Sequence, residues 1–124
     1  MQIHISDTVT IKHIQEEFNG QYPFLKLEFF SRPHASGKGS EKKYKRTEDA
    51  VLKDFRRVHS EGDLNIHDEM SVTELEELFK EHYGLYVQVF RRSGRLWLET
   101  TATDNWTLKT QNEQGRELSH GYSL

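Results

Sequence analysis

The fold is decided by residues 64–91, LNIHDEMSVTELEELFKEHYGLYVQVFR, whose pattern also occurs at residues 3–31, IHISDTVTIKHIQEEFNGQYPFLKLEFFS. Both stretches contain, in one order, an alternating apolar run, an acidic turn, apolar residues spaced by three and four, and a second alternating run. The stretches align without a gap as far as Tyr22 and Tyr83. Few aligned positions are identical, so the evidence lies in the apolar periodicity that a packed core requires. The pattern predicts two strand-helix-strand units around one shared hydrophobic core.

Helix boundaries are visible in both units. Thr10 stands where the first helix needs an N-cap, and Ser71 begins a Ser-x-x-Glu capping box for the second. Gly20 and Gly84 stand near the expected helix ends, where glycine commonly closes a helix. These signals support a helix at the centre of each unit.

The two units indicate an α+β protein. A helix that connects two strands normally returns the chain to the same edge of a sheet, so we expect parallel strands within each unit. We predict a two-layer sandwich with a mixed sheet of about five strands and with helices mainly on one face. This architecture resembles that of ferredoxin-like folds, and the resemblance implies no activity.

The chain of 124 residues fits a single domain, which we assign to residues 1–118. Residues 119–124 are expected to form a disordered tail. The predicted parts of the domain are, in order, a first unit at 2–31, a basic loop at 32–46, a helix at 47–58 and a second unit at 63–100. The helix at 47–58 is predicted from Thr47 as an N-cap and from apolar residues that share one helical stripe.

A hairpin is predicted at the end of the second unit, where Ser93-Gly94 separates two alternating runs. This turn places Phe90 opposite Trp97, with Arg92 and Arg95 on the same sheet face. Tryptophan and arginine concentrate at binding hot spots, and uncovered sheet faces favour association. The aromatic face is therefore a candidate surface for a protein partner or for a second copy of the chain.

A C-terminal helix offers a competing explanation for that face. It is expected between Thr103 and Gln114, with Gly115 as its stop. Its clearly apolar residues are Trp106 and Leu108. If these two side chains fold over the aromatic face, the face is part of the core and binds nothing.

Charge is unevenly distributed, although 17 Lys and Arg against 20 Asp and Glu leave a net charge of only −3. Residues 32–46 are basic, whereas residues 61–81 are strongly acidic. Cations beside an aromatic ring neutralise phosphates and stack a base, so the loop is a candidate site for an anion or nucleic acid. The candidate residues are Lys38, Lys42, Lys43, Tyr44, Lys45 and Arg46. The loop could instead dock on the acidic helix of the second unit.

Catalytic and metal-binding patterns are weak. The seven histidines lack metal-ligand spacing, and there is no cysteine for a disulfide or a thiolate site. His67-Asp68-Glu69 is the nearest approach to a metal-ligand cluster, and we favour its explanation as a strand-to-helix turn. Residues 36–40 differ from a phosphate-binding loop at Gly39, where Ser or Thr is required. No Gly-x-Ser-x-Gly motif occurs. We expect no catalytic residue, no cofactor and no metal.

Three function classes follow from these features. No run approaches the ~20 apolar residues that span a bilayer, and the N-terminus lacks the pattern of a secretory signal. We therefore expect a cytoplasmic protein without a membrane partner. The leading hypothesis is a small non-catalytic interaction or regulatory module. The alternative is a nucleic-acid-associated protein that uses the basic loop, and the third is a small enzyme with a site between the two units.

Overall fold

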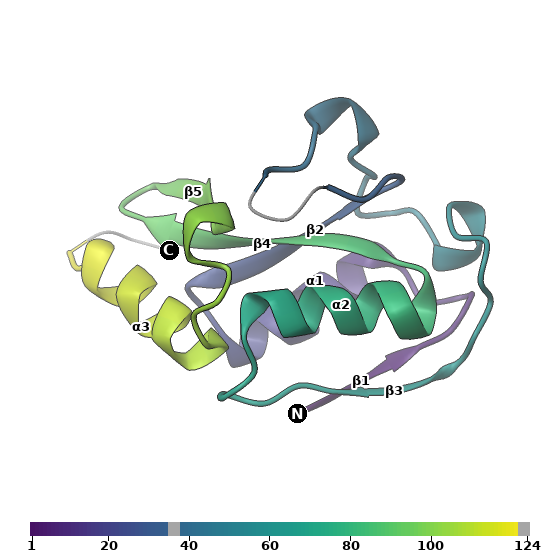
Figure 1. Cartoon of the computed structure of the whole chain (residues 1–124), viewed down its shortest axis with the longest axis horizontal. Helices are drawn as coiled ribbons and strands as arrows, with labels where there is room; N and C mark the ends of the chain where they lie inside the picture. The colour runs from purple at the N-terminus through teal and green to yellow at the C-terminus, as the bar shows by residue number, and fades with distance from the viewer. Residues whose placement is uncertain (35–37, 122–124) are drawn as a thin grey trace.

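The computed structural model describes residues 1–34 and 38–121. Within these residues the protein is an α+β structure of three α-helices and five strands (Figure 1), so the predicted class is confirmed. The strands are β1 (Gln2–Ile5), β2 (Leu25–Phe30), β3 (Gly62–Asn65), β4 (Tyr86–Ser93) and β5 (Leu96–Glu99). The helices are α1 (Ile11–Gln21), α2 (Val72–Tyr83) and α3 (Leu108–Leu118).

The strands belong to two antiparallel sheets, so the prediction of one mixed sheet was wrong. β1 pairs with β3, and β2, β4 and β5 form a second sheet in which β4 is central. Each of the first two helices connects strands of different sheets, and both lie between the sheets (Figure 1). The crossover rule applies to strands of one sheet, which is why parallel pairing was wrongly predicted. The two-layer sandwich and its ferredoxin-like relation are not confirmed.

The two predicted units share one hydrophobic core. Ile5 and Ile66 belong to the same buried cluster as Phe18 of α1 and Phe79 of α2. The ring of Phe79 packs edge-on against Phe29 of β2, with centroids 5.9 Å apart. The strand-helix-strand order occurs twice, and its apolar stripes meet in one interior.

Local signals fixed the starts of α1 and α2 as predicted. The hydroxyl of Thr10 accepts a hydrogen bond from the N–H of His13, and that of Ser71 accepts one from the N–H of Glu74. Gly84 closes α2 with a φ of 62°, a left-handed conformation that favours glycine. These three helix ends were predictable because their chemistry is local, whereas Gly20 lies inside α1, whose C-cap is Tyr22.

The helix predicted at 47–58 is wrong. Only a three-residue 3₁₀ turn, Leu52–Asp54, forms there. The backbone of the segment is used elsewhere, since the carbonyl of Ala50 accepts the N–H of Ile11 at 3.0 Å. The first N–H groups of a helix have no partner within it. The segment supplies one to α1, and this tertiary bond overrides the local helical pattern.

The C-terminal helix begins later than predicted. A 3₁₀ turn occupies Thr101–Thr103, and α3 starts at Leu108. Gly115 does not stop α3 but lies buried within it, because a β-carbon there would come within 2.8 Å of the Phe24 β-carbon. Of the predicted tail, Ser119 is the C-cap of α3, and residues 122–124 lie outside the described residues.

The hairpin turns at Gly94-Arg95, one residue later than predicted. Ser93 pairs with Leu96, and Arg92, not Phe90, is opposite Trp97. Gly94 has a φ of 63° and no described non-glycine residue has a positive φ. Glycine at the first central position is typical of a II′ turn, which explains the shift.

No helix in the described parts of the chain has the length and apolar character required to cross a bilayer.

Candidate interaction surfaces

The first candidate is the outer face of the three-stranded sheet, which points away from α1 and α2. The register places Arg92 opposite Trp97 and Lys26 opposite Phe90 on this face. The amine of Lys26 lies 5.1 Å from the Trp97 ring centre and 5.6 Å from that of Phe90. The Arg92 guanidinium lies 5.4 Å from the Trp97 ring centre. We call these four residues the Trp97 surface.

The cations hold the indole in place without burying it. Trp97 and Phe90 are both partly exposed, and each cation is within the range of a cation–π interaction. The Nε of Arg92 also donates to the carbonyl of Gly94 at 2.6 Å. Arg95, the fourth predicted residue, is exposed in the hairpin turn. The structure therefore brings together three of the four predicted residues and adds Lys26.

The C-terminal helix packs on the other face of the sheet, so the competing explanation was wrong. Arg91, whose side chain points opposite to that of Arg92, lies over the Trp106 ring at 5.5 Å. Arg91 also donates to the Gln111 side chain of α3 at 2.7 Å. Leu108 is fully buried in the core. Trp106 and Leu108 consequently do not cover the Trp97 surface, in which Trp97 and Phe90 are partly exposed and Arg92 is buried.

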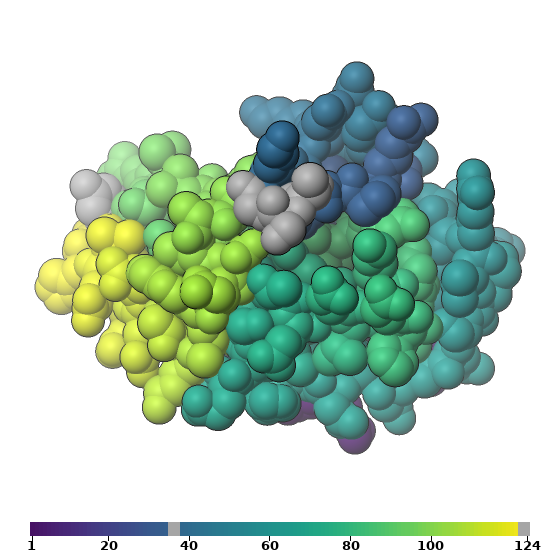
Figure 2. Space-filling view, in the orientation of Figure 1, coloured from purple at the N-terminus to yellow at the C-terminus, as the bar shows by residue number. Residues whose placement is uncertain are grey.

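The basic loop folds back over the outer face of the same sheet. The N–H of Ser31 donates to the carbonyl of Tyr44 at 2.9 Å, and the Ser40 hydroxyl donates to Gln88 of β4 at 3.4 Å. Gly39 lies against the Glu99 carboxylate of β5. In Figure 2 the blue atoms of this region project above the teal and green surface of the molecule. The loop covers the part of the sheet beside the Trp97 surface.

The predicted anion site is only partly assembled. Lys42, Lys45 and Arg46 line one cavity of about 510 Å³, but Glu28 and Glu48 line it too. Lys38 and Lys43 are not among the residues that line it.

Tyr44 is already engaged by cations of the loop. Arg32 lies 4.7 Å from its ring centre and Lys43 lies 5.2 Å away. Lys45 contacts Glu28 at 3.5 Å. Base stacking on Tyr44 would have to displace these contacts. Residues 36–40 were compared above with a phosphate-binding loop. Of these, residues 36 and 37 lie outside the described residues.

The acidic turn before α2 has a structural role. Asp68 accepts a hydrogen bond from the Tyr22 hydroxyl at 3.0 Å, which ties the second unit to the first. Burial, together with this bond to Asp68, raises the pKa of Tyr22. Among the described residues, no group of three or more His, Asp or Glu side chains is placed to hold a metal ion.

A second cluster, which the sequence did not reveal, joins the two units. The fully buried side chain of Arg56 donates to Asp7 at 2.8 Å and to the carbonyl of Tyr83 at 3.1 Å. His59 contacts the same carboxylate at 3.0 Å. The hydrogen bonds from His59 and Arg56 lower the pKa of Asp7. Sequence reasoning missed Arg56 because it lay within a wrongly predicted helix.

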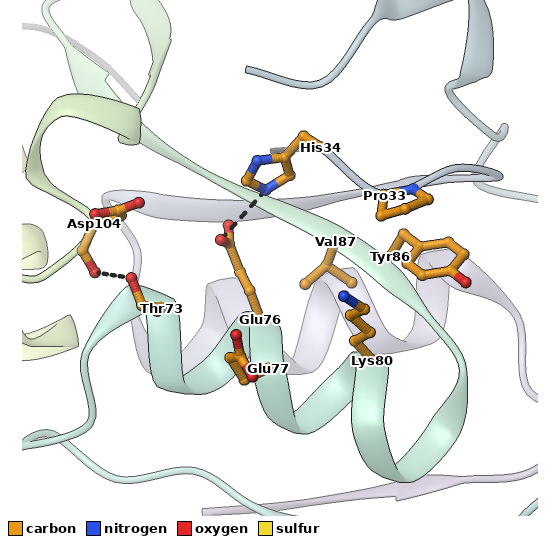
Figure 3. Close-up of a pocket in the computed structure, with 9 residues that line it drawn as sticks. All are labelled: Pro33, His34, Thr73, Glu76, Glu77, Lys80, Tyr86, Val87 and Asp104. Carbon is orange, nitrogen blue, oxygen red and sulfur yellow. Dashed lines mark hydrogen bonds and ion pairs between the residues drawn. The ribbon is translucent and has the colours of Figure 1, made fainter. Parts of the chain in front are cut away.

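The second candidate surface is a groove between β4 and α2, shown in Figure 3. Its volume is about 340 Å³. It is lined by Pro33, His34, Thr73, Glu76, Glu77, Lys80, Tyr86, Val87 and Asp104. Glu76 reaches from α2 toward His34, with 3.4 Å between Oε1 and Nε2 (Figure 3).

Sequence reasoning missed this groove because it depends on hairpin register. The alternating run that begins at Leu85 is longer than the run that ends at Glu99. That difference was a usable signal for an unpaired strand segment. The misplaced turn hid it, since the predicted register paired Gln88 with Glu99.

Comparisons with protein-family models, with curated proteins and with solved structures found nothing that matches this chain.

Proposed function

We propose that this protein is a small non-catalytic module that binds another protein through the Trp97 surface. The observation that supports this most directly is a partly exposed indole held between Lys26 and Arg92 on a face that α3 leaves uncovered. Tryptophan and arginine supply much of the binding energy at protein interfaces. An indole fixed by two cations loses little conformational freedom when a partner binds.

A hollow beside the indole gives a partner a place to insert. Trp97 and Lys26 line a cavity of about 330 Å³ that continues over the edge of β2 to α1. Glu16 and Glu28 supply carboxylates to its lining. A central aromatic residue beside a polar rim is the usual anatomy of a protein interface. The surface fits a protein partner better than a small anion.

The test compares two tryptophans on opposite faces of the sheet. Trp97→Ala removes the proposed anchor, and Trp106→Ala removes the partly exposed tryptophan that contacts Arg91 on the other face. Immobilised wild type and Trp106→Ala should retain the same proteins, and Trp97→Ala should lose them. Each retained protein is then purified and titrated against all three chains, where Trp97→Ala should weaken binding by about thirtyfold or more.

Self-association is measured in the same set. If the partner is a second copy, sedimentation of the wild type and Trp106→Ala shows a dimer that Trp97→Ala lacks. Equal retention, equal affinity and equal mass in all three proteins would contradict the proposal.

A nucleic-acid-associated role is the second candidate, favoured by Lys42, Lys45 and Arg46 in one cavity. Binding to a single-stranded oligonucleotide should then weaken steeply with salt. The double substitution Lys42→Glu/Arg46→Glu should abolish that binding, whereas Lys53→Glu/Lys109→Glu, which changes exposed lysines outside the loop, should not. Affinity that is indifferent to salt would remove this candidate.

A further inference from the structure

Among residues 1–34 and 38–121, no strand pairs with one side of the first part of β4. β5 pairs with β4 from Phe90 to Ser93, whereas β4 begins at Tyr86. On this side, residues 86–89 therefore have no neighbouring strand within the described part of the chain. We propose that the groove along this segment binds an extended, basic peptide segment of a partner protein, which adds to the sheet as a strand.

The backbone of Val87 presents the pairing groups. Arg92 donates its N–H to Phe24, so the even-numbered residues of β4 bond to β2 and the odd-numbered ones face the other side. Val89, the next odd residue toward β5, is satisfied there: its carbonyl accepts from the Thr100 N–H at 3.3 Å. Within residues 1–34 and 38–121, no such bond is made to the N–H or carbonyl of Val87. One donor and one acceptor therefore face the groove.

The shape of the groove fits a single strand. α2 forms one wall, and Pro33 and His34 form another beside the β4 edge (Figure 3). Asp104 closes one end, since its carbonyl accepts bonds from the N–H and hydroxyl of Thr73. An added strand lies about 4.8 Å from its neighbour, within these walls. A second copy of the chain would have to bring a whole sheet edge into the groove. The layers packed on that sheet would then collide with the walls formed by α2 and by Pro33 and His34.

The charge of the groove selects a basic segment. Glu76, Glu77 and Asp104 line it, against Lys80 and His34. A peptide lysine or arginine would be attracted by the excess of carboxylates, which are part of an acidic helix.

Glu76 protects the free edge of β4 against unspecific strand pairing. Its carboxylate accepts the N–H of Val89 at a long 3.4 Å. Charged side chains at strand edges prevent unwanted pairing in many proteins. An incoming strand has to displace this weak bond, and the Glu76 carboxylate then needs a new partner. A cationic side chain of the peptide supplies it.

The probe is a pool of capped heptapeptides with Lys at two fixed positions and Thr or Val at the alternating ones. A second pool carries Glu in place of Lys, and a third carries the Lys sequence with N-methyl groups on alternate amides. The readout is the ¹H–¹⁵N spectrum of the full chain with about 1 mM peptide, enough for millimolar affinity. The Lys pool should shift Val87 and its neighbours and protect the Val87 amide from exchange. The Glu pool should bind more weakly, and N-methylation should cost about tenfold or more.

Two glutamates of α2 provide a matched pair of variants. Glu77 lines the groove, whereas Glu81, one turn later and also exposed, is not among its lining residues. Glu77→Lys should weaken binding of the Lys pool by about three- to tenfold, and Glu81→Lys should leave it unchanged. Trp97→Ala should also leave it unchanged, which separates this site from the Trp97 surface.

Several outcomes overturn the proposal. Unchanged Val87 resonances with every pool would exclude peptide addition at this edge. Equal binding of the N-methylated pool would exclude backbone pairing. Shifts confined to the Trp97 surface would place the peptide elsewhere, and concentration-dependent Val87 shifts without peptide would identify a second copy as the occupant.

Discussion

The helix α1 donates hydrogen bonds to the outer edge of β2, whereas α2 makes a weak bond to the part of the β4 edge that β5 does not pair with. On β2, Gln15 donates its side-chain amide to the carbonyl of Leu27 at 2.8 Å. Asn19, one turn later on α1, donates to the carbonyl of Leu25 at 2.9 Å. On β4, the one hydrogen bond from the corresponding helix among the described residues is the long contact between Glu76 and the N–H of Val89.

The contrast is the more informative because the side chains correspond. In the alignment of the two stretches, Gln15 matches Glu76 and Asn19 matches Lys80. Two neutral amides donate to strand carbonyls and close one edge. A carboxylate and an amine at the same positions leave a charged groove along the other. The rest of the β2 edge is paired with the loop, since the carbonyl of Phe29 accepts the N–H of Arg46 and Phe30 forms a bridge with Lys45. Side-chain chemistry at two helix positions is thus one of the differences between the two edges.

The largest expected effect comes from removing the buried side chain of Arg56, which joins the two units through its hydrogen bonds to Asp7 and Tyr83. Arg56→Met leaves the buried carbonyl of Tyr83 and the carboxylate of Asp7 without their guanidinium partner. The free energy of unfolding should fall by about 2–3 kcal/mol, because the buried carbonyl of Tyr83 is left without a donor, while the Asp7 carboxylate is one-third exposed and keeps its contact with His59. Urea unfolding measures it, with Arg57→Met at the exposed neighbour as control. Equal stability of the two variants would show that the hydrogen bonds of Arg56 do not stabilise the fold.

The next effect tests whether the amides of α1 really close the β2 edge. Gln15→Ala/Asn19→Ala removes both donors to strand carbonyls, and should lower the free energy of unfolding by about 1–2 kcal/mol. Gln21→Ala, an exposed residue at the end of the same helix, is the control and should change little. Light scattering should also show more self-association in the double variant, since an uncapped edge pairs with other chains. A double variant as stable and monomeric as the control would remove the distinction between the two edges.

What the sequence predicted well depends on contacts between near neighbours. The caps at Thr10 and Ser71 and the apolar stripes ending at Phe18 and Phe79 are local signals, and the structure has all of them. Which strands pair is a long-range choice. The same alternating runs satisfy one mixed sheet or two antiparallel ones, so this part of the fold was wrongly predicted.

The candidate sites show the same limit. Phe90 and Trp97 were placed on one face because alternation along a strand survives a register shift of two residues. The groove at Val87 was missed because it exists only in the actual register, with the turn at Gly94-Arg95. Arg56 was missed because its partners, far apart in the chain, carry no sequence pattern.

A smaller effect sharpens the comparison from the β4 side. Glu76→Gln gives α2 the side chain that α1 has at the matching position, and its carbonyl can still accept the N–H of Val89. Stability should change by less than about 1 kcal/mol, since only the contact with His34 loses its charge. The preference for the Lys pool over the Glu pool should fall by about threefold, measured by titration, with Glu81→Gln as control. An unchanged preference would show that Glu76 does not select the charge of the peptide.

The smallest effect concerns the two-stranded sheet, whose exposed face carries the pairs of His4 with Asp63 and Glu61. The Nδ1 of His4 lies 2.9 Å from an oxygen of Asp63, and Nε2 lies 3.2 Å from one of Glu61. These hydrogen bonds, that to Asp63 first, raise the pKa of His4 above its ordinary 6.5. A raised folded-state pKa means that the stabilisation is complete below the unfolded pKa and is lost as pH rises through the folded pKa.

The measurement is therefore a difference between variants at two pH values. Thermal unfolding of the wild type and His4→Gln should differ at about pH 5.5 and converge at about pH 8.5, on either side of the histidine range. In an Asp63→Asn background the difference at the lower pH should shrink, since the main partner has lost its charge. A difference that persists at the higher pH would assign the effect of His4 to packing. If the wild type and His4→Gln unfold alike at both pH values, this sheet depends on its buried face, formed by Ile3, Ile5 and Leu64, and not on its ion pairs.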